Sequence, residues 1–239
     1  MALPKLNTNL IYETTIPSTG RNIKFRPFLV GEEKLFLIAA QSESIRVFYD
    51  TTKRVISQCV LEENFDVEEL KGYDLDYLFL QLRARSVGEQ EDLVVLCGEC
   101  DTKNNYSVDF QNDVYILNSD TSSEERVDLG NGIQIQLKAP TADSLIAMQE
   151  SNIADTEKAF LIIDKMIDKV YTQDEVLNFQ NENESERQEF VQSMTSAQLQ
   201  DVMNFLSNQP QIAVNIAFKC GHCGAENKRT LKGVSDFFG

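Results

Sequence analysis

The chain has 239 residues, of which 42% are hydrophobic and 25% are charged, a composition typical of a globular protein. Its 38 acidic residues outnumber the 22 basic ones, and the resulting formal net charge of −16 disfavours binding to nucleic-acid phosphates. The first residues lack the pattern of a signal peptide, and no apolar run approaches the length of a membrane span. We therefore expect a soluble, intracellular protein.

The first half of the chain predicts a strand followed by three helices. Alternating apolar residues place the strand over residues 23–25. Acidic residues followed by apolar residues at helical spacing predict a helix over residues 31–40. The same spacing predicts helices over about residues 45–61 and 74–83, the second with Asp74 as its N-cap.

Two Cys-x-x-Cys sequences each lie between an apolar run and a segment of alternating residues, which is the pattern of a β-hairpin with two thiols in its turn. The segments around them, residues 96–108 and 219–231, are similar along their length. Four thiolates from two such turns are the ligands of a tetrahedral structural zinc ion. We predict one shared Zn2+, with two separate or empty turns as the alternative. The predicted ligands are Cys97, Cys100, Cys220 and Cys223.

A redox role is the main competing interpretation of the second pair, because Cys-Gly-His-Cys also occurs in disulfide isomerases. That chemistry requires the first cysteine at a helix N-terminus. Residues 224–233 lack an apolar helical stripe and have glycine at both ends, which argues against a thiol oxidoreductase. We expect His222, the single histidine, to be an exposed spacer and Cys59 to be a core residue.

The sequence offers no arrangement of catalytic residues. With one histidine, a Ser-His-Asp or Cys-His set would have to borrow a residue from the second cysteine turn. No glycine-rich phosphate loop precedes a predicted helix. A zinc-ribbon module for nucleic acid is a further alternative, but it would require a basic face that this acidic chain lacks. We expect a protein that is not an enzyme and does not bind nucleic acid.

The second half of the chain appears in the sequence as a repeat of the first. Polar, turn-forming residues over 118–131 predict a linker between halves 1–117 and 132–239. The second half begins with an alternating strand and a helix, and a long helix is then predicted over residues 156–171. A last helix near residues 197–206 leads to the second cysteine turn. The predicted fold is α+β, with two pseudo-repeats of strand, helices, strand, Cys-x-x-Cys and strand, joined through one zinc-ribbon-like site. An internal duplication would explain this order.

Three segments taken together resemble one known family. These segments are residues 23–35, residues 76–89 before the first cysteine turn, and residues 231–238. In this order they resemble the baseplate hub proteins of T4-like contractile-tailed bacteriophages, and the resemblance covers most of the chain. It implies a non-enzymatic tail morphogenesis protein that acts in the host cytoplasm with other phage baseplate or hub proteins. It leaves open whether the protein is a permanent virion subunit or a chaperone that leaves before the tail is complete.

Under this resemblance, four residues are candidates for contact with hub partners. They are Arg26, Phe28, Phe237 and Phe238. The alternative is that Phe28 fills the core and that the C-terminal phenylalanines dock on their own sheet. Exposure of the two C-terminal rings would favour the partner contact.

Overall fold

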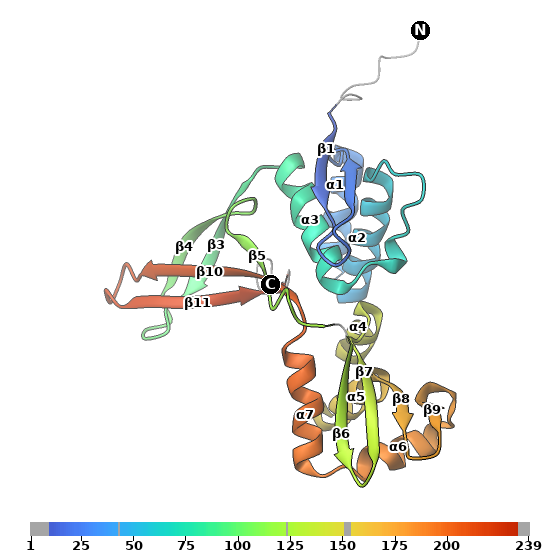
Figure 1. The fold of residues 1–239 in the computed structure, drawn as a ribbon. Helices are drawn as coiled ribbons and strands as arrows, with labels where there is room; N and C mark the ends of the chain where they lie inside the picture. Colours follow the sequence, from blue (N-terminus) through green and yellow to red (C-terminus); the bar gives the residue numbers. More distant parts are fainter. Residues whose placement is uncertain (1–9, 43, 123, 151–153, 234–239) are drawn as a thin grey trace. The chain divides into compact units, whose positions relative to one another are not determined.

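A computed structural model of the chain describes residues 10–42, 44–122, 124–150 and 154–233. It divides into two compact units (Figure 1). The first unit consists of residues 1–117 together with residues 211–239, and the second unit is Asn118–Pro210. Each unit has its own hydrophobic core.

The first unit begins with a β-hairpin that lies against helices (Figure 1). Helix α2 shows why these residues form a helix: the Ser44 hydroxyl accepts a hydrogen bond from the N–H of Val47, and Thr52, Val55, Ile56 and Cys59 are all buried along one face. The helices lie nearly where the sequence predicts them. The elements are β1 (Tyr12–Thr15), β2 (Asn22–Phe25), α1 (Val30–Gln41), α2 (Ile45–Cys59), the short 3-10 helix η1 (Val67–Glu69) and α3 (Gly72–Ser86).

The start of α3 differs from the prediction. The helix begins at Gly72 with Lys71 as its N-cap, so that Asp74 occupies the third helical position. Asp74 is fully buried, and its carboxylate accepts hydrogen bonds from the N–H of Ser18 (2.8 Å) and from the N–H of Lys71 (3.1 Å). The aspartate therefore caps the helix from inside its first turn and ties the loop after β1 to it.

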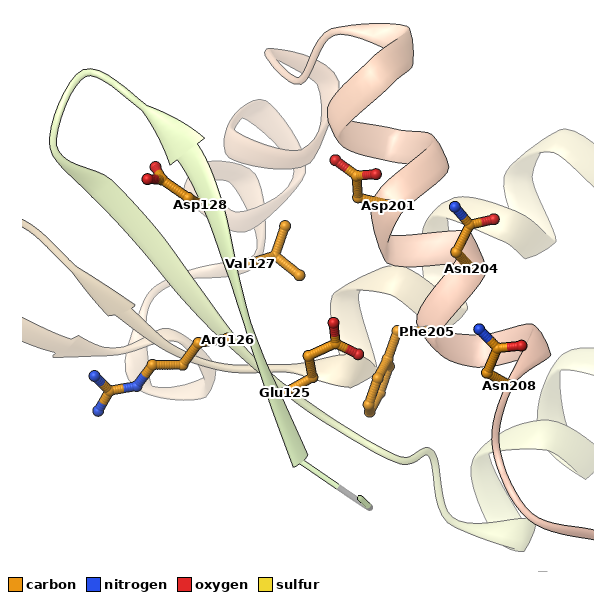
Figure 2. A pocket seen from close by; sticks show the side chains of 8 residues that line it. All are labelled: Glu125, Arg126, Val127, Asp128, Asp201, Asn204, Phe205 and Asn208. Atoms are coloured by element: carbon orange, nitrogen blue, oxygen red, sulfur yellow. The ribbon is translucent and has the colours of Figure 1, made fainter. Parts of the chain in front are cut away.

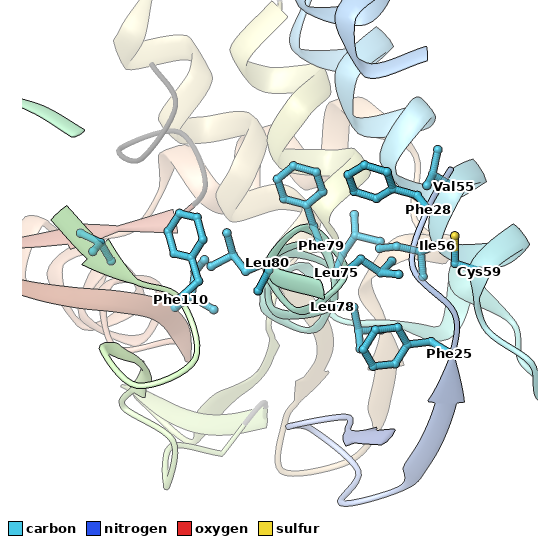
Figure 3. Packing of buried hydrophobic residues seen from close by; sticks show 14 of the residues in the cluster. Phe25, Phe28, Val55, Ile56, Cys59, Leu75, Leu78, Phe79, Leu80 and Phe110 are labelled. Carbon is cyan, nitrogen blue, oxygen red and sulfur yellow. The ribbon is translucent and has the colours of Figure 1, made fainter. Parts of the chain in front are cut away.

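Helix α3 lies at the centre of the first core. Figure 3 shows Leu80 and Phe110 on one side of this helix, and Phe28, Ile56 and Cys59 on the other. Because α3 buries side chains on both sides, its sequence is apolar around most of its circumference. The helical part of the unit and its β-hairpins therefore share one continuous core.

Two antiparallel hairpins complete the first unit and carry the cysteine turns. Strand β3 (Gln90–Leu96) pairs with β4 (Lys103–Asp109). Strand β10 (Gln211–Lys219) pairs with β11 (Glu226–Lys232) on one side and with β5 (Val114–Leu117) on the other. Both hairpins contribute buried side chains to the core around α3, namely Leu93, Val95, Val108, Ile212, Val214 and Ile216.

The second unit is an antiparallel sheet in the order β6-β7-β8-β9 with helices packed on it. Helix α5 ends at Met166 rather than at residue 171, because Ile167 starts a strand that pairs with β7. Isoleucine and valine favour strands, and residues 167–171 are therefore a strand rather than the predicted end of the helix. The elements are β6 (Glu124–Gly130), β7 (Ile133–Lys138), α4 (Ala142–Glu150), α5 (Asp155–Met166), β8 (Ile167–Tyr171), β9 (Val176–Asn178), η2 (Phe179–Asn181), α6 (Glu184–Gln192) and α7 (Ser196–Ser207).

The predicted α+β class is confirmed. In chain order both halves have strands, helices, and then a strand, a Cys-x-x-Cys turn and a strand, but the second half also has strands β8 and β9 between its helices. The predicted domain bounds need correction, because residues 118–131 contain β6 rather than a linker and residues 211–239 belong to the first unit. The reason is that β10 pairs with β5 and buries its apolar side chains around α3. Among the described helices, none is both long and apolar enough to cross a membrane.

Candidate metal centre

The two cysteine turns have the same backbone conformation. In each turn, the residue that follows the second cysteine adopts a positive φ angle: 53° at Asp101 and 74° at Gly224. Two backbone hydrogen bonds close each turn. They run from Cys97 N–H to Thr102 O (3.0 Å) and from Asp101 N–H to Cys97 O (3.1 Å), and from Cys220 N–H to Ala225 O (2.8 Å) and from Gly224 N–H to Cys220 O (3.0 Å).

The four thiols of these turns come together at one point. The Sγ atoms of Cys97, Cys100, Cys220 and Cys223 all lie within 4.8 Å of one another. The closest pairs across the two turns are Cys97 with Cys223 at 3.6 Å and Cys100 with Cys220 at 3.7 Å. Sulfurs at about 2.3 Å from a central zinc ion would be about 3.8 Å apart in a regular tetrahedron. The prediction that the two turns meet in one four-thiol cluster, which an internal duplication requires, is confirmed.

Backbone N–H groups point at the first sulfur of each turn. The N–H of Glu99 lies 3.4 Å from the Cys97 sulfur, and this bond is the main cause that lowers the pKa of Cys97. The pKa of Cys220 is lowered chiefly by the backbone N–H groups of Cys223 and His222, the latter 3.4 Å from the sulfur. Both first cysteines therefore lie in turns that favour the thiolate, which is the metal-binding form.

The second cysteines of the two turns differ from each other. The Thr102 hydroxyl, 3.3 Å from the Cys100 sulfur, is the main cause that lowers the pKa of Cys100 to about 7. The N–H of Ala225 lowers the pKa of Cys223, but the neighbouring thiols and burial outweigh it and raise that pKa to about 12. Four negative sulfurs at this spacing repel one another, and a divalent cation among them would remove that repulsion.

The geometry argues against a redox turn. Cys220 begins a hairpin turn that leads into β11, so that no helix dipole acts on its thiol. His222 is exposed, as expected for a spacer. Cys59 is fully buried in the first core, and burial raises its pKa to about 12, as expected for a structural residue.

Two asparagines beside the thiols were missed by the sequence analysis. The side-chain amide of Asn104 lies 3.7 Å from the Cys220 sulfur, and that of Asn227 lies 3.5 Å from the Cys97 sulfur. Each asparagine therefore reaches the sulfur of the opposite hairpin. The signal in the sequence was their equivalent position in the two similar segments, seven residues after the first cysteine.

The first pair of expected partner residues is engaged within the first unit. Phe28 is only 9% exposed and packs on Phe36 with ring centroids 5.6 Å apart, which agrees with the core alternative; contact of its ring with a hub partner stays a prediction. Arg26 forms a two-bond ion pair with Glu32, with N–O distances of 2.9 and 2.6 Å. Phe237 and Phe238 lie outside the described residues.

The Arg26–Glu32 pair predicts a pH-dependent loss of stability. The hydrogen bonds of the Glu32 carboxylate with Arg26 are the main cause that lowers the pKa of Glu32. This carboxylate also accepts a hydrogen bond from the N–H of Leu29 at 2.7 Å. A lowered pKa stabilises the fold above the unfolded-state pKa of about 4.3, and this stability is lost as pH falls through the folded-state pKa. We expect Glu32→Gln to lower the free energy of unfolding at pH 7 by roughly 1 kcal/mol.

Urea denaturation at pH 7 and at successively lower pH measures this effect. The difference between wild type and Glu32→Gln should shrink as pH falls, because both proteins then carry a neutral group. Glu33→Gln, on the exposed neighbouring position, serves as the control and should show little change at any pH. A difference that stayed constant with pH would contradict the assignment.

The second unit has a shallow polar groove between β6 and α7 with a volume of about 320 Å³. Figure 2 shows Asp128 and Asp201 on opposite walls of the groove and Arg126 pointing away from α7. Acidic side chains that are spread along an open groove in this way are typical of a solvated surface. We assign no function to this groove.

Comparison with known proteins gives one family. The profile of a family described as T4 bacteriophage base plate protein matches residues 9–239, which is nearly the entire chain. No curated protein and no solved structure matches the chain significantly. The resemblance to baseplate proteins that the sequence analysis identified is confirmed at the level of this family.

Proposed function

The chain belongs to the family of T4 bacteriophage base plate proteins, and we propose that it is a non-enzymatic subunit of the central hub of the tail baseplate. The observation that carries this proposal is the extent of the family match, because residues 9–239 include parts of both units. The family match by itself does not specify the hub. That assignment within the baseplate rests on the three sequence segments that resemble hub proteins. Other baseplate and hub proteins are then its partners, and assembly takes place in the host cytoplasm.

The second part of the proposal is that the four-thiol cluster holds one structural Zn2+. The cross-turn sulfur distances of 3.6 and 3.7 Å support a single tetrahedral ion. Zinc bound by these cysteines would cross-link the β3–β4 hairpin to the β10–β11 hairpin, which are far apart in the sequence. Four thiolate ligands leave no open position for water or substrate, which supports a structural rather than a catalytic ion.

A nucleic-acid module is a weaker candidate. Zinc-ribbon proteins that bind nucleic acid need a basic surface, whereas this chain has a net charge of −16. Lys228, Arg229 and Lys232 on β11 are basic residues near the second turn, but three such residues are a small electrostatic footprint. A role within a protein assembly fits the charge better.

The experiment is quantitative mass spectrometry of finished, purified phage particles, with known baseplate subunits as the internal scale. We expect peptides of this protein in a fixed ratio to those subunits. An abundant non-structural phage protein, measured in the same samples, sets the level of contamination. Abundance in the infected lysate together with absence from particles would overturn the subunit proposal and make the protein a transient assembly chaperone.

A further inference from the structure

Asn104 and Asn227 occupy equivalent positions on the return strands of the two cysteine hairpins. Asn104 lies on β4 and Asn227 lies on β11, each seven residues after the first cysteine of its own turn. Asn227 is 8% exposed, and Asn104 is partly buried. An asparagine on a strand more often faces solvent, so the burial of these two amides calls for a reason.

The reason lies in their hydrogen bonds, which are the same in both hairpins. Each side-chain oxygen accepts the N–H of the glycine in the opposite turn: Gly221 to Asn104 at 3.0 Å and Gly98 to Asn227 at 2.8 Å. A backbone N–H can only donate, so this bond fixes the oxygen and turns the NH2 group toward the sulfur.

The NH2 group of each amide then has two acceptors. One is a carbonyl of its own turn, Thr102 for Asn104 at 2.8 Å and Ala225 for Asn227 at 3.1 Å. The other is the first sulfur of the opposite turn, at 3.7 Å and 3.5 Å respectively. Each amide thus uses its oxygen and both hydrogens of its NH2 group. It links its own turn to the glycine N–H and to the first sulfur of the opposite turn.

Asparagine is the side chain that fits this set of bonds. Aspartate offers an acceptor for the glycine N–H but no donor for the sulfur, and it would place a negative charge beside the thiolates. Alanine offers neither. Because the first sulfur of each turn is buried, a direct N–H donor replaces the water that would otherwise solvate its charge.

We propose that Asn104 and Asn227 are positioning residues of the metal centre and form a reciprocal asparagine clasp, in which each hairpin holds and polarises the first cysteine sulfur of the other. This inference rests on the proposed metal site. Outer-shell groups that hold a ligand typically contribute 10–100-fold to metal affinity. The asparagine clasp therefore contributes to metal retention through both hairpins equally.

The test is a set of variants of the full chain: Asn104→Ala, Asn227→Ala, Asn104→Asp, Asn227→Asp and the control Asn105→Ala. Asn105 is adjacent to Asn104 on β4 but is exposed. Two quantities are measured for each variant: the dissociation constant of Zn2+ by competition with a chromophoric chelator, and the thiolate-to-cobalt charge-transfer band after substitution with Co2+.

We expect each alanine variant to raise the dissociation constant of Zn2+ by roughly 10–100-fold and by a similar factor at the two positions. The aspartate variants should raise it at least as much. The cobalt band should shift in all four variants, because the band depends on charge at the sulfur, and a merely structural role would not move it. Asn105→Ala should match wild type in both measurements.

If an alanine variant fails to fold, the near-isosteric aspartate variant at the same position tests the asparagine clasp instead, by the same two measurements. Wild-type affinity and an unshifted band in the variants at either position would overturn the asparagine clasp while leaving the metal site intact. A wild-type chain that binds neither Zn2+ nor Co2+ would overturn the metal site, and the inference would fall with it. The two failures are therefore distinguishable.

Discussion

Removal of the proposed structural zinc is expected to have the largest effect on the stability of the first unit. The ion would join Cys97 and Cys100 to Cys220 and Cys223, and the sulfur pairs that it would hold are separated by 126 and 120 residues along the chain. Structural zinc in small zinc-finger peptides binds with an apparent free energy of about 10–16 kcal/mol, which sets the upper limit here because the hairpins also pack on α3. We expect chelation to lower the melting temperature of the first unit by roughly 20 °C.

Elemental analysis and thermal denaturation measure this effect. We expect one zinc ion per chain in wild type, loss of the ion in Cys220→Ser, and equal melting temperatures for Cys220→Ser and chelated wild type. Cys59→Ala is the matched control: it removes a buried thiol from the same unit, so it should cost stability while one zinc ion remains bound. A metal-free wild type with an unchanged melting temperature in chelator would contradict the prediction. Bound iron instead of zinc would keep the four-thiol site but correct the identity of the ion.

Truncation of Phe79 is expected to have the next largest effect. This ring is 6% exposed, and it contacts the rings of Phe36 and Phe48 with centroid distances of 5.3 and 5.7 Å. Phe79→Ala removes these edge contacts and leaves a cavity next to α3. We expect the free energy of unfolding of the first unit to fall by about 3–5 kcal/mol.

Chemical denaturation, followed through a signal of the first unit, measures this loss. Leu37→Ala on α1 is the control, because Leu37 is 61% exposed and its truncation should change stability by less than about 0.5 kcal/mol. Zinc content should stay at the wild-type level in both variants. A loss below about 1 kcal/mol for Phe79→Ala would mean that the aromatic cluster repacks around the cavity.

Metal removal and truncation of Phe79 affect different parts of the first unit. The thiols and the asparagine clasp hold the ends of the hairpins, whereas Phe79 fills the core from which those hairpins extend. The hairpins are therefore held both by the apolar side chains that they bury around α3 and by the proposed metal centre at their ends.

Local features of this protein can be predicted from its sequence alone. Apolar residues at helical spacing predicted α1 and α2 nearly to their ends, because an amphipathic helix leaves its period in the sequence. The meeting of four thiols from the two cysteine turns was predicted because Cys-x-x-Cys has few other uses between two strands. The baseplate family was also predicted from the sequence, because three segments in a fixed order resemble that family.

Other features depend on contacts between residues that are distant in the sequence, and they are seen only in the folded chain. Strand β10 could join either half of the chain, and its pairing with β5 and its burial against α3 place it in the first unit. The apolar pattern at Ile167 and Val170 fits a helix as well as a strand, and pairing with β7 selects the strand. The asparagine clasp joins residues separated by 116 or more positions, so no local sequence pattern predicts it. Helical periodicity depends on neighbouring residues and is therefore visible in the sequence. Strand pairing and side-chain contacts across hairpins form only when distant parts of the chain come together in the folded state.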